Sequence, residues 1–539
     1  MTKDIKKTSS LIKSLTKNIA TGNIEQEVRA LINSPGFDIE EALKIGEILM
    51  RNEMFDLASR IYAKIIEIDD KNIIALSNLG GTLVNLQQYP YAESVLRYAL
   101  ELDPNYTPAL INIGGSLQGQ GKREDVLNMA LRAVCSDPSN AMCHQNLGAA
   151  FSDLGKSEEA RHSFETALIL DPNLVDAEIC IATIDQQQGE NLDSALNRYK
   201  RALKIIPKNN NMKKDLVKFY MGNLYLRLGD LKNGWNYFEH GFSKLLPKDA
   251  GRNPNRIFSK PQWNGENLKG KTLLVWREQG VGDLIIFSTV LKELEKLDGS
   301  IIVEVDRRLV TSFQRSFNKF LIREQNYIEN APSPIEDFDF QIPLISLMKY
   351  YRNTNEKFLN KVTDYIQTDP KKDFTFEQRL NKFWDKKKIG ICWRSGKLDP
   401  NRNKDYTQLS DWKNVLSNPD YIFVNLQYGD CEEEIISAEH ELGINIVRWT
   451  DVNLKDDFDS VFSIIKNLDA VVSVSSTPFA MGGAVGTPTV LMTRQEWSTL
   501  NFKERYAWFN SVIPIYVPQG ELMASSLPKV NTILKLIFQ

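Results

Sequence analysis

Prolines recur every 34 residues in the N-terminal half of the chain, and this period constrains the fold more than any other feature. The interval joins Pro104, Pro138 and Pro172. Glycines keep the same interval at Gly46, Gly80, Gly114 and Gly148. Small residues let two helices pack closely, and proline ends a helix because it has no N–H to donate. The spacing predicts an α-solenoid of helix pairs with a concave groove.

An asparagine stands two residues before the repeat glycine in three of these units, at Asn78, Asn112 and Asn146. This position falls on the first helix of each pair, whose face lines the groove. A series of amides can hydrogen-bond an extended peptide backbone without reading its side chains. The alternative is that asparagine is only a tolerated feature of the repeat. The helix pairs as a whole resemble tetratricopeptide repeats, with about five copies over residues 40–207.

Beyond residue 243 the pattern changes from helical repeats to short apolar runs separated by helices. Such Val- and Ile-rich strands indicate parallel sheets covered on both faces, with ligands beyond the carboxyl ends of the strands. We expect strands at 272–276, 300–305, 388–393, 421–427, 444–449, 469–475 and 488–492, and helices at about 284–297 and 373–388. The predicted order is an N-terminal helical cap (1–39), helical repeats (40–243), a linker rich in Pro, Gly and Asn (244–270), and two Rossmann-like α/β lobes (271–385 and 386–539).

The composition favours a globular protein of the cytoplasm. A formal net charge of −3 at pH 7 gives no reason to expect a nucleic-acid partner. The five cysteines show no CxxC spacing, and the four histidines are scattered, so neither a disulfide framework nor a metal centre is expected. No apolar run reaches the roughly 18 residues of a membrane span, and none is expected.

The loop EQGVGD, residues 278–283, joins the first strand of the first lobe to its first helix. Gly280 and Gly282 let the backbone bend and let a ligand approach, and the helix N-terminus favours an anion. Asp283 has two possible roles there. It can cap the helix, or it can act as a general base that takes the proton of an acceptor hydroxyl.

The second lobe carries the candidates for binding a donor nucleotide. Hydroxyls at Ser475, Ser476 and Thr477 precede a helix, where a diphosphate is favourable. A basic loop, residues 394–412, contributes Arg394 and Arg402. Gln427 and Tyr428 follow another strand and are candidates to flank a nucleotide base.

Three segments of the α/β half resemble the heptosyltransferase-like glycosyltransferases. They are W-x-G-E-x-L-x-G-K-T-L-L-V-W-x-E-Q-G-V-G-D (Trp263–Asp283), IGICWRSG (389–396) and VVSVSSTPFAMGGAVGTPTVL (471–491). With the repeats in front, the similarity covers nearly the whole chain. It implies a GT-B fold, a nucleotide-sugar donor as substrate, no separate cofactor and no metal ion.

The resemblance also implies a function. One branch of these enzymes carries tetratricopeptide repeats and includes flagellin glycosyltransferases, so a sugar would pass with inversion to a Ser or Thr of an acceptor protein. Asp283 occupies the position of the catalytic base, and Lys404 that of a residue contacting the donor phosphate. The asparagine series is similar to the ladder in O-linked N-acetylglucosamine transferase, which implies that the repeats hold the acceptor, with flagellin the first example.

Two positions depart from the family pattern. Relatives commonly have an Asp and a His where this chain has Ser475 and Ala480. Loss of both keeps open a second hypothesis, in which the chain is a repeat scaffold whose transferase module is degenerate and only binds. A third hypothesis keeps the enzyme and makes the acceptor a glycan.

Overall fold

The computed structural model describes residues 24–539 except 190, 247–249, 255, 329–330, 359–363 and 397–403. Its contacts define two compact units. One reaches to Ile184 and includes Lys200–Ile205, and the other comprises Asp185–Tyr199 with Ile206–Gln539.

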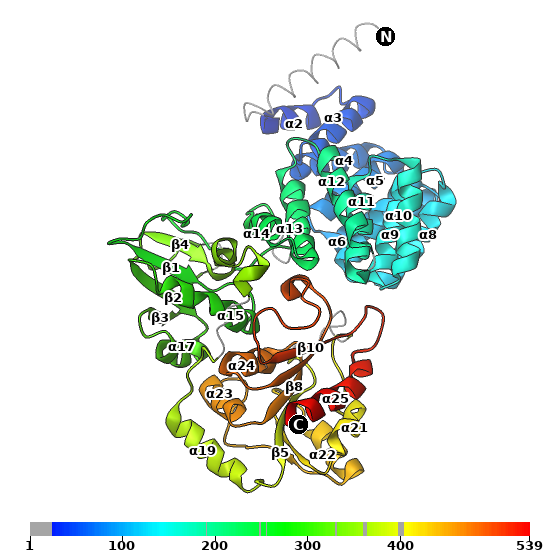
Figure 1. The fold of residues 1–539 in the computed structure, drawn as a ribbon. Helices are drawn as coiled ribbons and strands as arrows, with labels where there is room; N and C mark the ends of the chain where they lie inside the picture. The colour runs from blue at the N-terminus through cyan, green and yellow to red at the C-terminus, as the bar shows by residue number, and fades with distance from the viewer. Residues whose placement is uncertain are drawn as a thin grey trace. The chain divides into compact units, whose positions relative to one another are not determined.

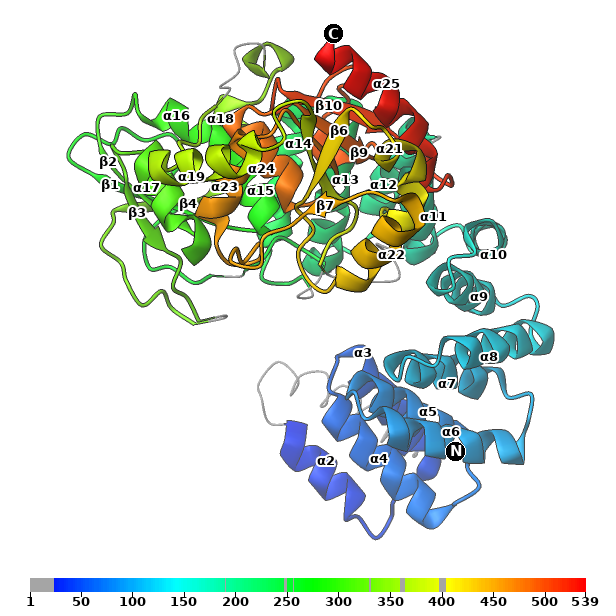
Figure 2. The same cartoon turned by 90° about the horizontal axis from the view of Figure 1, so that it is seen from below.

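The N-terminal half is a solenoid of helix pairs, and the prediction of an α-solenoid is confirmed. Helix α2 (Ile24–Ile32) precedes the pairs, and the helices of the first unit lie side by side (Figure 2). The pairs among the described residues are α3 (Ile39–Arg51) with α4 (Phe55–Ile68), α5 (Ile73–Asn85) with α6 (Tyr89–Leu102), α7 (Thr107–Gly119) with α8 (Arg123–Ser136), α9 (Ala141–Asp153) with α10 (Ser157–Leu170), and α11 (Val175–Gln188) with α12 (Leu192–Ile205).

The repeated residues act as the sequence predicted. Pro104 and Pro138 each fall two residues after the last residue of a helix, α6 and α8 respectively, because proline cannot continue the hydrogen-bond pattern. Gly80 packs so closely on the next helix that an added Cβ would lie 2.3 Å from Leu96 Cγ. A side chain at this glycine would therefore push the two helices apart.

Two further helices, α13 (Asn211–Leu228) and α14 (Leu231–Phe238), belong to the second unit. The sequence placed them in the repeat region that ends at 243. In the structure they pack on the α/β part: Trp235 Nε1 donates to Arg352 O at 2.8 Å, and the Phe238 ring lies 5.0 Å from that of Trp497. The second unit therefore takes in α13 and α14 together with Asp185–Tyr199 of the preceding helix pair.

The α/β part contains two parallel sheets, which confirms the predicted fold class (Figure 1). The first has the order β3-β2-β1-β4, and its strands are β1 (Thr272–Trp276), β2 (Ser300–Val305), β3 (Leu321–Glu324) and β4 (Phe340–Pro343). The second has the order β10-β9-β8-β5-β6-β7, and its strands are β5 (Lys387–Cys392), β6 (Tyr421–Asn425), β7 (Ile446–Val447), β8 (Ala470–Val474), β9 (Thr489–Thr493) and β10 (Val512–Tyr516).

Helices flank both sheets. Those of the first lobe are α15 (Val281–Phe287), α16 (Leu291–Leu294), α17 (Val310–Ser316) and α18 (Met348–Tyr351), and α19 (Pro370–Asn381) leads to the second lobe. Those of the second lobe are α21 (Lys413–Leu416), α22 (Glu432–Leu442), α23 (Phe458–Lys466), α24 (Thr477–Val485) and α25 (Leu527–Phe538). Short 3₁₀ turns, including η7 (Trp497–Thr499), complete the connections.

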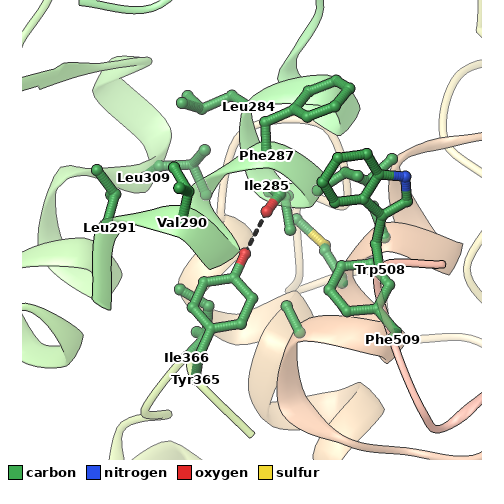
Figure 3. Close-up of a cluster of buried hydrophobic side chains, with 14 of the residues drawn as sticks. Leu284, Ile285, Phe287, Val290, Leu291, Leu309, Tyr365, Ile366, Trp508 and Phe509 are labelled. Atoms are coloured by element: carbon green, nitrogen blue, oxygen red, sulfur yellow. Dashed lines mark hydrogen bonds between the residues drawn. The ribbon is translucent and has the colours of Figure 1, made fainter. Parts of the chain in front are cut away.

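The two lobes share one apolar core, which lies directly behind the start of α15 (Figure 3). Phe287 of α15 meets Trp508 of the second lobe edge to face, with ring centroids 4.7 Å apart. The Tyr365 hydroxyl donates a hydrogen bond to Ile285 O. The helix that carries Asp283 is thereby held by residues from both lobes.

Candidate functional site

The first unit contains a groove of about 660 Å³ that brings the three predicted asparagines together. Asn78, Asn112 and Asn146 lie on α5, α7 and α9 and are half-buried in its wall. Asn112 also has a structural contact, because its Nδ2 donates to Ser77 O at 3.0 Å and so joins α7 to α5. The amides are therefore placed where an extended chain in the groove would meet them.

In the second unit, the predicted loop EQGVGD begins α15. Gly280 is the N-cap residue, and its N–H donates to Asp283 Oδ2 at 3.2 Å. Asp283 thus makes the capping contact that the sequence offered as its first role. Its half-buried carboxylate is fixed at the start of the helix, the position that the general-base hypothesis assigns to it. The contact is compatible with either role.

A buried ion pair holds this loop from behind. Glu278 is fully buried and bonds the guanidinium of Arg252, and its Oε1 accepts the Ile345 N–H at 2.9 Å. Arg252 also contacts Glu239 at 2.7 Å, and its guanidinium lies 4.0 Å from the Phe242 ring centroid. Glu278 is therefore an anchor of the loop.

The hydroxyls before α24 differ in their surroundings. Ser476 is buried, and its Oγ lies 2.9 Å from Ser473 Oγ. Ser475 is exposed and lies 2.9 Å from Thr493 Oγ1. Thr477 is the first residue of α24, half-buried, and its hydroxyl bonds no described residue. Ser475 and Thr477 are thus the more accessible of the three predicted hydroxyls.

The loops at the starts of α15 and α24 face each other. A Cβ added to Gly282 would lie 4.0 Å from Thr477 Cα. Trp497, which follows β9, stacks on Phe287 of α15 with ring centroids 5.8 Å apart and planes 6° apart. The structure therefore brings Asp283 of the first lobe close to the predicted donor hydroxyls of the second.

Arg494, at the end of β9, holds the segment that carries Lys404. Its Nε donates to Asp405 Oδ1 at 2.7 Å, and its Nη2 donates to the carbonyls of Lys404 at 3.1 Å and Glu521 at 2.8 Å. Arg494 is buried, whereas Lys404 is exposed. The buried arginine thus fixes the backbone and leaves the lysine ammonium accessible.

Glu496, two residues after Arg494, is a further charged residue of this region. The residue is exposed, yet the protein around it excludes enough water that desolvation is the largest cause of its raised pKa. The carboxylates of Asp405 and Asp283 raise the pKa of Glu496 further, and the cations Arg227 and Lys404 oppose them. Two other carboxylates and two cations, from separate segments, therefore act on Glu496.

Two predicted donor-binding side chains are engaged within the protein. Arg394 pairs with Glu434 at 2.5 Å. Gln427 is buried, and its Oε1 accepts the N–H groups of Trp393 at 3.2 Å and Arg394 at 3.0 Å. Both contacts order the end of β5.

Tyr428 lies against the segment that follows β5. A Cβ added to Gly396 would lie 2.6 Å from its Cε2. The ring is half-buried and so keeps one part accessible. Arg402, the other basic candidate of this region, lies outside the described residues.

Sequence reasoning missed Glu496, Arg494 and Arg252. No motif marks them, since each acts through partners distant in the chain. The available signal was weak: an arginine two residues before a glutamate, directly after an apolar strand.

Among the described residues, no cluster of three or more His, Cys, Asp or Glu side chains is arranged to hold a metal ion. Nor does any helix within the described ranges combine the length and apolar character needed to cross a bilayer.

Comparison with known proteins supports the repeat half. The family model of the tetratricopeptide repeat matches residues 143–174, which include most of α9 and all of α10. This match and the helix pairs define a tetratricopeptide-repeat protein with a C-terminal α/β module.

One curated relative is Protein FlbA of Caulobacter vibrioides, 32% identical over 339 residues. The matched region is 59% of this chain and 55% of that protein, so the chain spans about half the length of the relative.

Solved structures that match part of the chain include a thermophilic TPR protein of Thermus thermophilus, at 21% identity and a TM-score of 0.31 over 33% of this chain and 96% of that one. Another is pilF of Pseudomonas aeruginosa, at 21% identity and a TM-score of 0.32 over 37% of this chain and 89% of that one.

Proposed function

We propose that the protein is a cytoplasmic protein O-glycosyltransferase. It would transfer a sugar from a nucleotide-sugar donor to a Ser or Thr of an acceptor protein held by the repeats. The observation that carries this proposal is the meeting of the two loops, with Gly282 of α15 against Thr477 of α24. The charges of Asp283 and Lys404 both act on the pKa of Glu496, which favours the same region for the lysine. A carboxylate, hydroxyls and a lysine at one place are the groups that sugar transfer from a diphosphate needs.

In this mechanism the Asp283 carboxylate accepts the proton of the acceptor hydroxyl. The hydroxyl oxygen attacks the anomeric carbon, the bond from that carbon to the phosphate oxygen breaks, and the nucleotide leaves with its electron pair. Lys404, Ser475 and Thr477 stabilise the charge on the departing phosphate. The N-cap contact with Gly280 orients Asp283, and Arg494 orients Lys404.

The acceptor would lie in the groove of the repeats, with its backbone on the asparagine amides. A flagellin is the first acceptor to test, because the family resemblance includes flagellin glycosyltransferases. The neutral amides favour a protein segment, since they pair with peptide groups.

The decisive variant is Asp283→Asn, because the amide oxygen of asparagine can still accept the Gly280 N–H whereas the amide cannot act as the base. Transfer from a panel of nucleotide sugars to purified flagellin, followed by mass spectrometry, is expected to fall by about 10²–10⁴-fold. Nucleotide binding, measured by melting shifts with UDP, GDP, CMP, ADP and dTDP, is expected to persist. Glu504→Gln, at an exposed position of the second lobe, is the matched control. Unchanged transfer by the asparagine variant would reject Asp283 as the base and leave it a cap.

A second candidate function is a repeat scaffold that binds without turnover. Ser475 and Ala480 favour it, because relatives commonly have an Asp and a His at these positions. Ala480 is fully buried in α24, so this position presents no polar group to a sugar. If none of the five nucleotides shifts the melting temperature, the scaffold becomes the better account.

A further inference from the structure

In most repeats, the glycine of the first helix packs against a large side chain sixteen residues later in the sequence. Each of these side chains is fully buried, and a Cβ added to the glycine would collide with it. The pairs and the distances from the added Cβ are Gly46 with Tyr62 (2.6 Å), Gly80 with Leu96 (2.3 Å) and Gly148 with Phe164 (2.8 Å).

The third repeat breaks this rule. The residue sixteen positions after Gly114 is Ala130, and no heavy atom outside its own helix lies within 4 Å of a Cβ added to Gly114. Both residues line the groove of about 660 Å³, and Ala133 of α8 lines it too. Because α8 is the second helix of its pair, the groove must reach past α7 to α8 at this point. The space that Tyr, Leu or Phe fills in other repeats is open here.

We propose that this space, the third-repeat pocket (Gly114, Ala130 and Ala133), receives one large apolar side chain from an extended segment of a partner protein. The size of the anchor follows from the repeats themselves, since Tyr62, Leu96 and Phe164 occupy the equivalent space. Its apolar character follows from the walls, because an unpaired charge in an apolar pocket is unfavourable. Such a buried anchor is the usual centre of a protein interface.

The charge of the groove defines the rest of the segment. Asp153 is the one ionisable side chain among the described residues of the lining, and Gln118 Nε2 donates to it at 3.1 Å. An acidic segment would meet a like charge there, whereas a neutral or basic one would not. The amide nitrogen of Asn112 is already bonded to Ser77, whereas Asn78 and Asn146 also line the groove and can meet the backbone of the segment. The inference rests on that part of the proposed function which places an acceptor in the groove.

Filling the pocket tests the proposal. Ala130→Leu recreates the Gly80–Leu96 pair of the preceding repeat, so the variant is expected to melt no lower than the wild type. Peptides of twelve residues, selected from a random display library on the full-length protein, are expected to share one aromatic or large aliphatic residue and to lack acidic ones. Their affinity should fall by about tenfold or more for Ala130→Leu, and likewise when the shared residue becomes Ala.

Two further variants keep the test decisive. Gly114→Ala places a Cβ into open space and favours the helix, so it is expected to fold and to weaken peptide binding in the same direction. Asn128→Leu adds the same side chain as Ala130→Leu on an exposed position of α8 and is expected to leave binding unchanged. Equal peptide affinity for the wild type, Ala130→Leu and Gly114→Ala would overturn the proposal.

Other results also separate the hypotheses. A library that gives no peptide sensitive to Ala130→Leu would overturn the pocket. So would a change of oligomeric state on filling the pocket without peptide binding, because the occupant would then be a second copy of the chain. Nucleotide-induced melting shifts report on the α/β module and are expected to be the same in Ala130→Leu. If no nucleotide shifts the melting temperature of the wild type or of Ala130→Leu, the transferase is rejected. The peptide affinities would still test the third-repeat pocket independently.

Discussion

At the scale of single residues, buried charge is what orders the candidate catalytic loop. Arg252 lies in the segment that the sequence assigned to a linker, yet its side chain is fully buried. It touches Glu278 and Glu239 and lies between the rings of Phe238 and Phe242, 4.7 and 4.0 Å from their centroids. The buried guanidinium is tolerated because these two carboxylates and two aromatic rings compensate its loss of hydration. Removing the cation would leave the buried Glu278 carboxylate without the positive charge that it pairs with.

Arg252→Met is therefore expected to destabilise the α/β module by about 3–5 kcal/mol, the usual cost of an uncompensated buried charge. Urea unfolding followed by tryptophan fluorescence measures the loss. The double variant Arg252→Met/Glu278→Gln should recover part of it, because the unpaired carboxylate is then absent. A double variant no more stable than the single one would show that the pair is not what holds this loop.

At the scale of helices, each pair of the solenoid is stabilised mainly by its neighbours, and Glu93 of α6 makes one such connection. Its carboxylate contacts Lys122 Nζ at 2.9 Å, Arg97 Nη2 at 2.6 Å and Gln120 Nε2 at 2.7 Å. Lys122 and Gln120 belong to the turn between α7 and α8, so the carboxylate joins two repeats. The hydrogen bond from Lys122, followed by those from Arg97 and Gln120, outweighs partial burial and lowers the pKa of Glu93 to about 2.

Glu93→Gln is expected to lower the stability of the repeats by about 1.5–3 kcal/mol at pH 7, the range for a hydrogen bond to a charged group. Because the folded pKa is depressed, the contribution is present above the ordinary value of 4.5 and is lost as the pH falls towards 2. Thermal unfolding of both proteins from pH 7 to pH 2 tests this. The difference should shrink with acidity, and a constant difference would contradict the ionic origin.

At the scale of the whole molecule, the contacts separate a repeat unit from an α/β unit that includes α13 and α14. Within the α/β unit the two sheets are firmly joined. Arg315 of α17 bonds both carboxylate oxygens of Asp459 in α23, at 3.0 and 3.1 Å. The aromatic rings of Phe287, Trp497 and Trp508 add an apolar connection between the lobes.

Calorimetry is accordingly expected to show two unfolding transitions, because the two units have separate cores. Arg252→Met should lower one midpoint and Glu93→Gln the other. A nucleotide at 100 times its dissociation constant should stabilise only the transition affected by Arg252→Met, by about 2.7 kcal/mol. A single transition moved by both substitutions would show that the chain unfolds as one unit.

The sequence by itself determined the helical array and the central strands. The 34-residue period is most simply explained by helix pairs. The strands β1 (272–276) and β2 (300–305) lie where the apolar runs predicted them. It also identified the loop at Asp283 and the hydroxyls at Ser475 and Thr477, since both follow strands of parallel sheets.

The tertiary structure alone decided the rest. β3, β4 and β10 were not predicted; all three are edge strands, which are half-paired and more tolerant of polar residues and proline. The predicted helix at 284–297 is interrupted by a 3₁₀ turn at Ser288–Val290. Arg252, Arg494 and Glu496 acquire their roles from partners brought close only by folding, and the opening beside Gly114 depends on which side chain of α8 faces it. A repeating residue pattern predicts helices and strands because it depends on residues that are close in the sequence. Charge pairs and pockets instead depend on contacts between segments that are distant in the sequence.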